Sequence, residues 1–162
     1  MNPSPHLLAD DRGVVTQCPR CHRANRIPFS RLHQSGQCGS CKAPLAHPAL
    51  PVEIESLAIF SALIAGASLP VLVDFWAPWC GPCQMVAPEV ARLAALVAGT
   101  MLVAKVNTEA NPDIAGRLGV RSIPLFVVFF NGKEVDRTAG AMGAEQLQAF
   151  ASAAARRAEG AR

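Results

Sequence analysis

Residues 71–83, which read VLVDFWAPWCGPC, decide the fold of this chain. The first six of them are almost all apolar, which is typical of a strand buried on both faces of a sheet. From about residue 81 to residue 97, apolar side chains recur at helical spacing. Cys80 and Cys83 are therefore expected where a buried strand passes into the first turn of a helix.

Two cysteines at such a junction have predictable chemistry. Free backbone N–H groups and the helix dipole stabilise a thiolate, so Cys80 should ionise more readily than an ordinary thiol. Cys83 follows three residues later on the same helical face, within reach of a disulfide. A bare C-x-x-C spacing is about as typical of a metal knuckle or a buried cysteine pair as it is of a redox dithiol. The preceding Trp79 and the enclosed Gly81-Pro82 favour a redox dithiol, since proline suits the first turn of a helix.

Residues 74–83, DFWAPWCGPC, closely resemble the active-site signature of the thioredoxin family. The resemblance covers about residues 52–150 and implies an α/β thioredoxin fold, a mixed sheet flanked by helices. It also implies a protein-disulfide reductase that acts on disulfide-bonded protein substrates and is recycled by an NADPH-dependent thioredoxin reductase. Gly81-Pro82 resembles the reducing members, whereas oxidants and isomerases usually carry Pro-His or Gly-His there.

A second cysteine pattern precedes this region. Two C-x2-C pairs are separated by sixteen residues, a spacing that predicts four thiolates around one zinc ion. The cysteines of this pattern are Cys18, Cys21, Cys38 and Cys41. About 30 residues hold too little core to fold alone, so metal binding would supply the folding free energy. Gly39 allows the left-handed backbone that such a knuckle often needs.

Other interpretations of these four cysteines are weaker. Cys18 and Cys21 could form a second redox pair, but no buried strand or helix frames them. Two disulfides conflict with the reducing compartment expected below. With this zinc module the resemblance extends from Cys18 and points to the zinc-carrying bacterial thioredoxins of the thioredoxin 2 type. A non-catalytic zinc adaptor that retains a redox-like motif is the alternative function. A hybrid also stays open, in which the zinc site is redox-responsive and oxidation of its cysteines ejects zinc and retunes the enzyme.

Composition limits the remaining possibilities. The chain has 162 residues, a net charge of +3, and no run of about 18 apolar residues that a membrane span would need. No secretory signal is recognised at the N-terminus, so we expect a cytoplasmic, monomeric protein without a membrane partner. The first 48 residues carry a net +4, but Phe29 is their only aromatic residue, so no nucleic-acid partner is expected.

Proline content and periodicity divide the chain. We expect a loosely held tail at 1–17, the zinc module at 18–41, a Pro-rich linker at 42–51, the thioredoxin domain at 52–156 and a C-terminal tail at 157–162. The predicted strands are 52–55, 71–76, 102–106, 125–130 and 134–138, and the predicted helices are 56–65, 81–97, 113–118 and 144–156. Parallel units followed by a hairpin indicate a mixed sheet with helices on both faces.

Asp74 is a carboxylate in the middle of a strand expected to be buried. A structural acid satisfied by hydrogen bonds is one interpretation. The other is a proton acceptor beneath the dithiol, because a buried acid with a raised pKa exchanges protons near neutral pH. Lys105, on the predicted neighbouring strand, is its expected charge partner. Thioredoxins carry an Asp and a Lys at these motif positions.

The resemblance also implies a substrate-binding surface. Thioredoxins keep a cis proline at the position of Pro124, which would turn the Ile123 backbone toward the cysteines to pair with a substrate strand. Gly140-Ala141 matches the small-residue loop beside the site, and with Trp79, Gly81 and Pro82 it would form a flat apolar docking surface. Leu125 departs from the family, which usually has Thr there.

Overall fold

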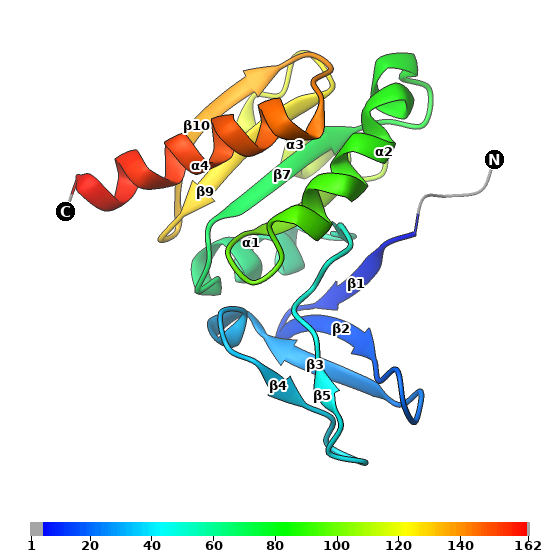
Figure 1. The fold of residues 1–162 in the computed structure, drawn as a ribbon. Coiled ribbons are helices and arrows are strands. Elements are labelled where there is room, and N and C mark those ends of the chain that lie inside the picture. The colour runs from blue at the N-terminus through cyan, green and yellow to red at the C-terminus, as the bar shows by residue number, and fades with distance from the viewer. Residues whose placement is uncertain (1–4, 162) are drawn as a thin grey trace.

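The computed structural model describes residues 5–161 and is organised around β7, Val71–Trp76 (Figure 1). Strand β8, Leu102–Asn107, pairs with β7 in parallel, and β9, Leu125–Phe130, pairs with it on the other side in antiparallel. Every residue of β7 except the last is buried, because helices cover both faces of the sheet. The predicted central strand is confirmed.

The sheet has eight strands in the order β10-β9-β7-β8-β6-β1-β2-β3. The remaining members are β10 (Lys133–Ala139), β6 (Val52–Glu53), β1 (Leu7–Asp10), β2 (Gly13–Gln17) and β3 (Ala24–Pro28). A separate two-stranded sheet pairs β4 (Gly36–Gln37) with β5 (Pro44–Leu45). The predicted mixed sheet is therefore correct, but it is extended by three strands from the N-terminal region.

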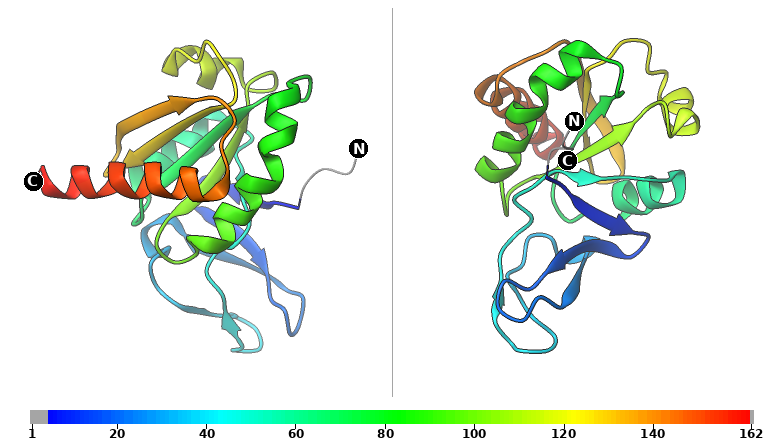
Figure 2. Two further views of the ribbon diagram at one scale, coloured as in Figure 1. Left: turned by 45° about the horizontal axis from the view of Figure 1, so that its top comes forward. Right: turned by 90° about the vertical axis from the view of Figure 1, so that its right-hand side faces the viewer.

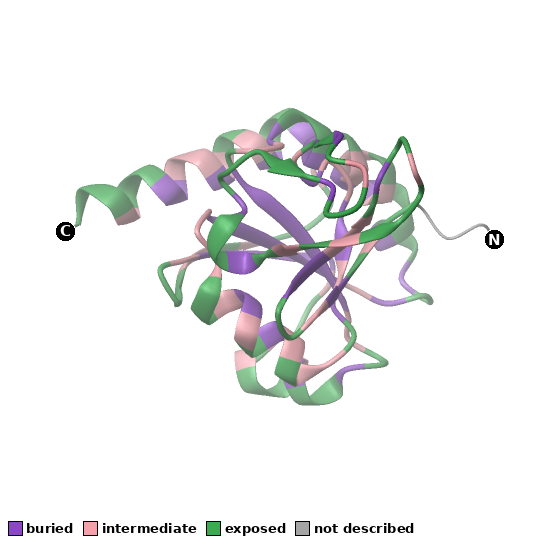
Figure 3. Cartoon of the chain, turned by 90° about the horizontal axis from the view of Figure 1, so that it is seen from below, coloured by how far each residue is buried: buried purple, intermediate pink, exposed green. Residues whose placement is uncertain are grey.

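Four helices within the described residues cover the two faces of the sheet (Figures 1 and 2). On one face lie α2 (Gly81–Leu96) and α4 (Ala144–Gly160), and on the other α1 (Leu57–Gly66) and α3 (Pro112–Leu118). Side chains of β7 alternate between the two cores: Leu72 packs with α2 and α4, whereas Val73 and Phe75 pack with α1 and α3. Figure 3 shows these strands as the buried layer of the molecule.

Local sequence signals explain how several elements begin and end. Ser56 caps α1, because its hydroxyl accepts a hydrogen bond from the Ile59 N–H at 3.2 Å. Asn131 and Gly132 both have positive φ, 52° and 78°, which suits the tight turn between β9 and β10. Helix α4 continues to Gly160 through good helix formers, so residues 157–160 are helical rather than the expected tail. Residue 162 lies outside the described residues.

The expected tail at 1–17 is largely wrong. Residues 1–4 lie outside the described part, but residues 7–17 form β1 and β2, and β1 pairs in parallel with β6 (Leu7 with Val52). The turn between them is built by Asp10, whose Oδ1 accepts hydrogen bonds from the N–H groups of Arg12 and Gly13. Without β1, strand β6 would expose an unpaired edge, so the N-terminal strand completes the sheet.

The four-cysteine region packs against the thioredoxin region. A short 3₁₀ helix, Phe29–Arg31, places Phe29 in the core shared with α1 and β7, and the following Leu32 is fully buried there. The Ser68 N–H donates to the Phe29 carbonyl at 3.0 Å. Residues 42–51 contain β5, and the His47 Nδ1 lies 3.1 Å from the Leu32 carbonyl oxygen. The expected Pro-rich linker is therefore held against the four-cysteine region through β5 and His47.

No helix among residues 5–161 is both long enough and apolar enough to cross a membrane.

Candidate functional site

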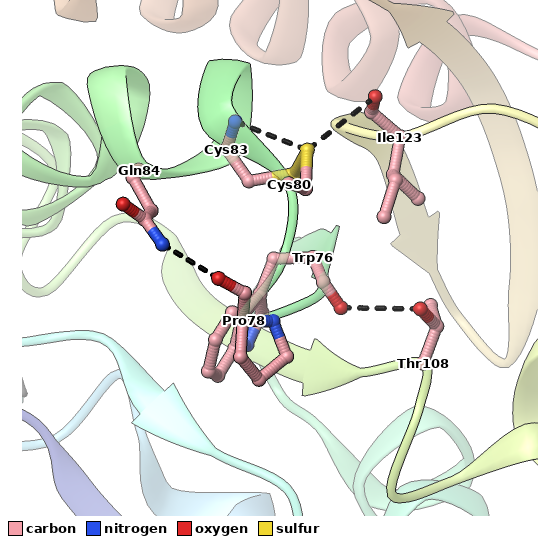
Figure 4. Close-up of a disulfide and its surroundings, with 7 residues drawn as sticks. All are labelled: Trp76, Pro78, Cys80, Cys83, Gln84, Thr108 and Ile123. Atoms are coloured by element: carbon pink, nitrogen blue, oxygen red, sulfur yellow. Dashed lines mark hydrogen bonds between the residues drawn. A yellow bond between two sulfur atoms is a disulfide. The ribbon is translucent and has the colours of Figure 1, made fainter.

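Cys80 and Cys83 occupy the turn between β7 and α2, where they are joined in a disulfide (Figure 4). Cys80 is the N-cap of α2, and its sulfur accepts a hydrogen bond from the Cys83 N–H at 3.2 Å. Pro82 lies in the first turn, where its missing N–H removes no helical hydrogen bond. The sulfur of Cys80 is thus placed at the positive end of the helix dipole, as the sequence predicts.

Hydrogen bonds hold this turn in place from three sides. The Cys80 N–H donates to the Ala77 carbonyl at 3.1 Å, and the Gln84 side-chain amide donates to the Pro78 carbonyl at 2.6 Å. From the loop after β8, Thr108 donates to the Trp76 carbonyl through its N–H and its hydroxyl (Figure 4). The cysteines therefore lie on a well-supported turn rather than on a free loop.

Ile123 and Pro124 lie directly beside the cysteines. The peptide bond between them is cis, as the resemblance implies. The Ile123 carbonyl oxygen lies 3.8 Å from the Cys80 sulfur (Figure 4). The Gly140 N–H donates to the Pro124 carbonyl at 3.0 Å, and Gly140 needs its positive φ of 103° to do so. The structure brings together these three segments that are far apart in the sequence.

Both cysteines are nearly buried, with 4% of Cys80 and 3% of Cys83 exposed, so burial does not distinguish them in the disulfide. Trp79 beside them is 70% exposed, and Gly81, Pro82, Gly140 and Ala141 are also exposed. Met85, 78% exposed on α2, is a large apolar residue that our sequence analysis missed. Its place one turn after Gly81 and Pro82 could have identified it.

Asp74 lies in the middle of β7 and is only 1% exposed. Its Oδ1 has no hydrogen-bond partner among the described residues. Burial raises the pKa of Asp74 to about 7, while the charge of Lys105 opposes that rise and the charge of Glu53 adds to it. A carboxyl with its pKa in this range is able to exchange a proton near neutral pH, as the second interpretation of Asp74 requires.

Lys105 is the cross-strand partner of Asp74 in the β7–β8 register. It makes no ion pair at contact distance with any carboxylate in the described part of the chain. Its ammonium lies 4.8 Å above the centre of the Trp76 ring instead, a cation–π arrangement. The expected electrostatic partnership with Asp74 is present, but direct contact is not.

The four sulfurs of the N-terminal region lie within 4.8 Å of one another. Cys18 and Cys41 sulfurs are 3.5 Å apart, and Cys21 and Cys38 sulfurs are 3.6 Å apart. A tetrahedral zinc ion with bonds of about 2.3 Å separates its sulfur ligands by about 3.8 Å. The donor set and its spacing therefore fit zinc.

The two knuckles have the same backbone design. The Arg20 N–H donates to the Cys18 sulfur and the Ser40 N–H to the Cys38 sulfur, each at 3.4 Å. The left-handed residues are His22 and Lys42, with φ of 62° and 64°. Gly39 does not use the conformation that glycine allows, because each chain reversal falls on the residue after the second cysteine.

The electrostatics of this cluster favour a bound cation. Donation from the Cys41 N–H and the Asn25 side chain lowers the pKa of Cys38 to about 6. Although the Ala43 N–H favours a thiolate at Cys41, burial and the three other sulfurs raise the pKa of Cys41 to about 11. Four thiolates this close repel one another unless a divalent ion neutralises them.

Comparisons with known proteins agree with this geometry. The family model described as Thioredoxin matches residues 51–153, and the one described as Thioredoxin 2, N-terminal matches residues 17–43. Thioredoxin C-3 of Corynebacterium nephridii is 39% identical over 135 residues, which are 83% of this chain and 91% of that protein. Thioredoxin 1 of Synechococcus elongatus is 49% identical over 85 residues, 52% of this chain and 79% of that protein.

Solved structures show the same fold. A thioredoxin variant from Halobacterium salinarum superposes with a TM-score of 0.61 at 31% identity, covering 67% of this chain and 94% of that one. The chain therefore belongs to the thioredoxin family of thiol–disulfide oxidoreductases and carries, before its thioredoxin domain, the N-terminal ribbon domain of the thioredoxin 2 type.

Proposed function

We propose that Cys80 and Cys83 reduce disulfide bonds of protein substrates, with Cys80 as the nucleophile. The observation that supports this assignment best is the position of the Cys80 sulfur, which caps α2, accepts the Cys83 N–H and faces the Ile123 carbonyl. A helix N-terminus stabilises the thiolate form, which is the attacking species in thiol–disulfide exchange.

The reaction proceeds in two steps. The Cys80 thiolate attacks one sulfur of the substrate disulfide, and the other substrate sulfur leaves as a thiolate that takes a proton from water. Cys83 then loses its proton to the Asp74 carboxylate and attacks Cys80, which releases the second substrate sulfur. The substrate gains two electrons, and the chain is left with the Cys80–Cys83 disulfide. By analogy with its family, an NADPH-dependent thioredoxin reductase returns it to the dithiol.

The substrate segment docks on the exposed surface around the cysteines. Trp79, Gly81 and Pro82 provide one side of this surface, and Gly140 and Ala141 provide the other. Between them lies Ile123, whose carbonyl is available to pair with an extended substrate backbone. Small residues on both sides allow a polypeptide to approach the Cys80 sulfur closely.

The ribbon binds one zinc ion through Cys18, Cys21, Cys38 and Cys41. Zinc supplies structural cross-linking here, because four cysteine ligands leave no open position for substrate. The N–H donors of Arg20 and Ser40 hold two of the sulfurs in the orientation that coordination needs.

Replacing Cys83 with serine is expected to trap the mixed disulfide. Cys80 can still attack a substrate disulfide, but nothing remains to resolve the intermediate. Non-reducing gels and mass spectrometry should show a covalent complex with a disulfide-bonded protein, and added dithiothreitol should dissolve it. Cys80→Ser is the matched control and should give no complex. Turnover by Cys83→Ser at the wild-type rate would disprove the resolving role.

Asp74→Asn is expected to stabilise the fold at alkaline pH. The folded-state pKa of Asp74 is raised from 3.8 to about 7, so the folded chain holds a proton that the unfolded chain has lost. Stability therefore falls as pH rises through that window, by roughly 4 kcal/mol in all. Urea unfolding should show the variant more stable by about this amount near pH 8 and equal to wild type below about pH 4.

The matched control for this experiment is Asp11→Asn, which removes an acid at an exposed position. With this variant, the difference in the free energy of unfolding between about pH 4 and about pH 8 should be almost the same as in the wild-type chain. If Asp74→Asn and the wild-type chain were equally stable near pH 8, the pKa of Asp74 would not be raised in the folded state.

A further inference from the structure

Glu53, Lys105 and Asp74 form one row across three neighbouring strands. Glu53 of β6 and Asp74 of β7 are both register partners of Lys105 in β8. Paired residues of parallel strands point to the same face, which here is the one that packs against α2. A single ammonium group thus lies between two carboxylates, and no residue of this row except Asp74 and Lys105 was singled out by the sequence.

A cavity of about 800 Å³ adjoins this row. Glu53 and Lys105 line it from the sheet, Trp76 from the end of β7, and Cys83 from the first turn of α2. Cys83 and two members of the row, Glu53 and Lys105, therefore border the same space. Asp74 lies behind them, buried in the sheet.

The N-terminal extension closes the outer side of the row. Strand β1 pairs with β6 so that Leu8 is the register partner of Glu53. His6 also lines the cavity, and its charge favours ionisation of Glu53. Because β1 covers β6, Glu53 is half-buried instead of lying at an open sheet edge.

The charges of the row are mutually dependent. Burial raises the pKa of Glu53, and the charge of Lys105 opposes this rise. The same ammonium favours ionisation of Asp74, which Glu53 disfavours. Lys105 makes no contact ion pair with either acid. Its ammonium lies over the Trp76 ring, and its charge acts on both carboxylates from there. The charged groups that act on Asp74 are thus Lys105 from β8 and Glu53 from β6. Cys83 from α2 lines the same cavity as these two residues.

We propose that Glu53 is a positioning residue that shares Lys105 with Asp74 and thereby sets how readily Asp74 accepts the proton of Cys83. The last clause rests on the proposed function of Asp74, whereas the sharing of Lys105 does not. When Glu53 is ionised, its negative charge offsets part of the stabilisation that the Lys105 ammonium gives to the Asp74 carboxylate. Asp74 then keeps its proton at a higher pH than it would beside Lys105 alone.

The test is the titration of the Asp74 carboxyl, followed by NMR in the reduced, zinc-loaded full chain. Glu53→Gln should lower its midpoint by at least about half a pH unit, because the two acids lie only two strand spacings apart, about 10 Å, on either side of Lys105 in a poorly solvated row. Glu55→Gln is the matched control: it removes the same charge from an exposed side chain that lines the same cavity. It should shift the midpoint much less. Glu53→Asp keeps the carboxylate, so the Asp74 midpoint in this variant should stay close to the wild-type value.

A double-mutant cycle tests the role of Lys105 itself. In a Lys105→Met background, Glu53→Gln should lower the Asp74 midpoint by clearly less than in the wild-type chain. An undiminished effect would overturn the sharing of Lys105 and leave direct repulsion between the acids. Equal shifts from Glu53→Gln and Glu55→Gln, or no shift, would overturn the proposal altogether.

Single-turnover reduction of a disulfide substrate against pH separates this proposal from the proposed function. If Asp74 accepts the Cys83 proton, the acid limb of the rate profile should move with the NMR midpoint in Glu53→Gln. A moved midpoint with an unmoved rate profile would support the coupling through Lys105 and reject Asp74 as the proton acceptor.

Discussion

Cys80→Ser is expected to lower disulfide reductase activity by at least about a thousandfold, because it removes the nucleophile itself. A serine hydroxyl at the N-cap of α2 can still accept the Cys83 N–H, so the fold should survive. Dithiothreitol-driven reduction of insulin measures the loss directly. A non-catalytic zinc adaptor makes the opposite prediction, since neither wild type nor variant would accelerate the reaction.

The matched comparison is with Cys83→Ser, the other half of the pair. Both variants should lose turnover, but only Cys83→Ser should still consume one equivalent of a disulfide substrate in a single attack. If Cys80→Ser alone retained that attack, the two cysteines would have exchanged roles. Circular dichroism of both variants checks that the loss is chemical and not structural.

Cys38→Ser is expected to abolish zinc binding and to unfold the ribbon. Metal content should fall from one zinc ion per chain to none, with the loss of roughly 10 kcal/mol of binding free energy. Cys38 is fully buried and its sulfur accepts hydrogen bonds from Ser40 and Asn25, so the variant removes a zinc ligand that the surrounding residues hold in place. Hydrogen exchange should show lost protection across residues 18–45.

The effect should extend into the thioredoxin domain but stop short of its active site. Phe29 and Leu32 pack into the core beside α1, so amide protection in α1 should fall as well. Ser40→Ala is the matched control, because this exposed residue lies in the same knuckle and donates only through its backbone N–H. Full protection of residues 18–45 in metal-free Cys38→Ser would contradict a ribbon that needs zinc to fold.

The elements near the cysteines could be predicted because their signals are local. A continuous apolar run, the Ser56 cap and Asn131-Gly132 each determine structure within a few residues. The roles of Cys80 and Cys83 likewise follow from one turn. These parts of the fold agree with the sequence analysis to within a few residues at each boundary.

The first strand, β1, could not be predicted because one of its two partners is distant. Residues 7–10 pair with the nearby β2 on one side, but on the other side with β6, more than 40 residues later. The sequence does carry one signal, the turn residues from Asp10 to Gly13. Only glycine fits at the end of this turn, because a Cβ on Gly13 would lie 2.2 Å from the Ile27 carbonyl oxygen. Together with the apolar residues on both sides of that turn, it could have indicated a hairpin.

Glu53 was missed for a related reason. The alternation of Val52 to Glu55 predicts which face Glu53 occupies, but not that its register partner is Lys105. Register between parallel strands depends on helices and crossovers far along the chain. The buried Asp74 was recognised, whereas the second acid that competes for the same lysine needed the assembled sheet.

The most direct test of the account is the ionisation of Cys80 in the reduced chain, measured as the rate of alkylation against pH in Cys83→Ser. We predict that Cys80 reacts rapidly and that its rate reaches half of its maximum well below about pH 8.5, where an ordinary thiol is half ionised. A Cys80 that is still protonated at about pH 8.5, or that alkylating agents do not reach, would contradict the assignment of Cys80 as the attacking thiolate.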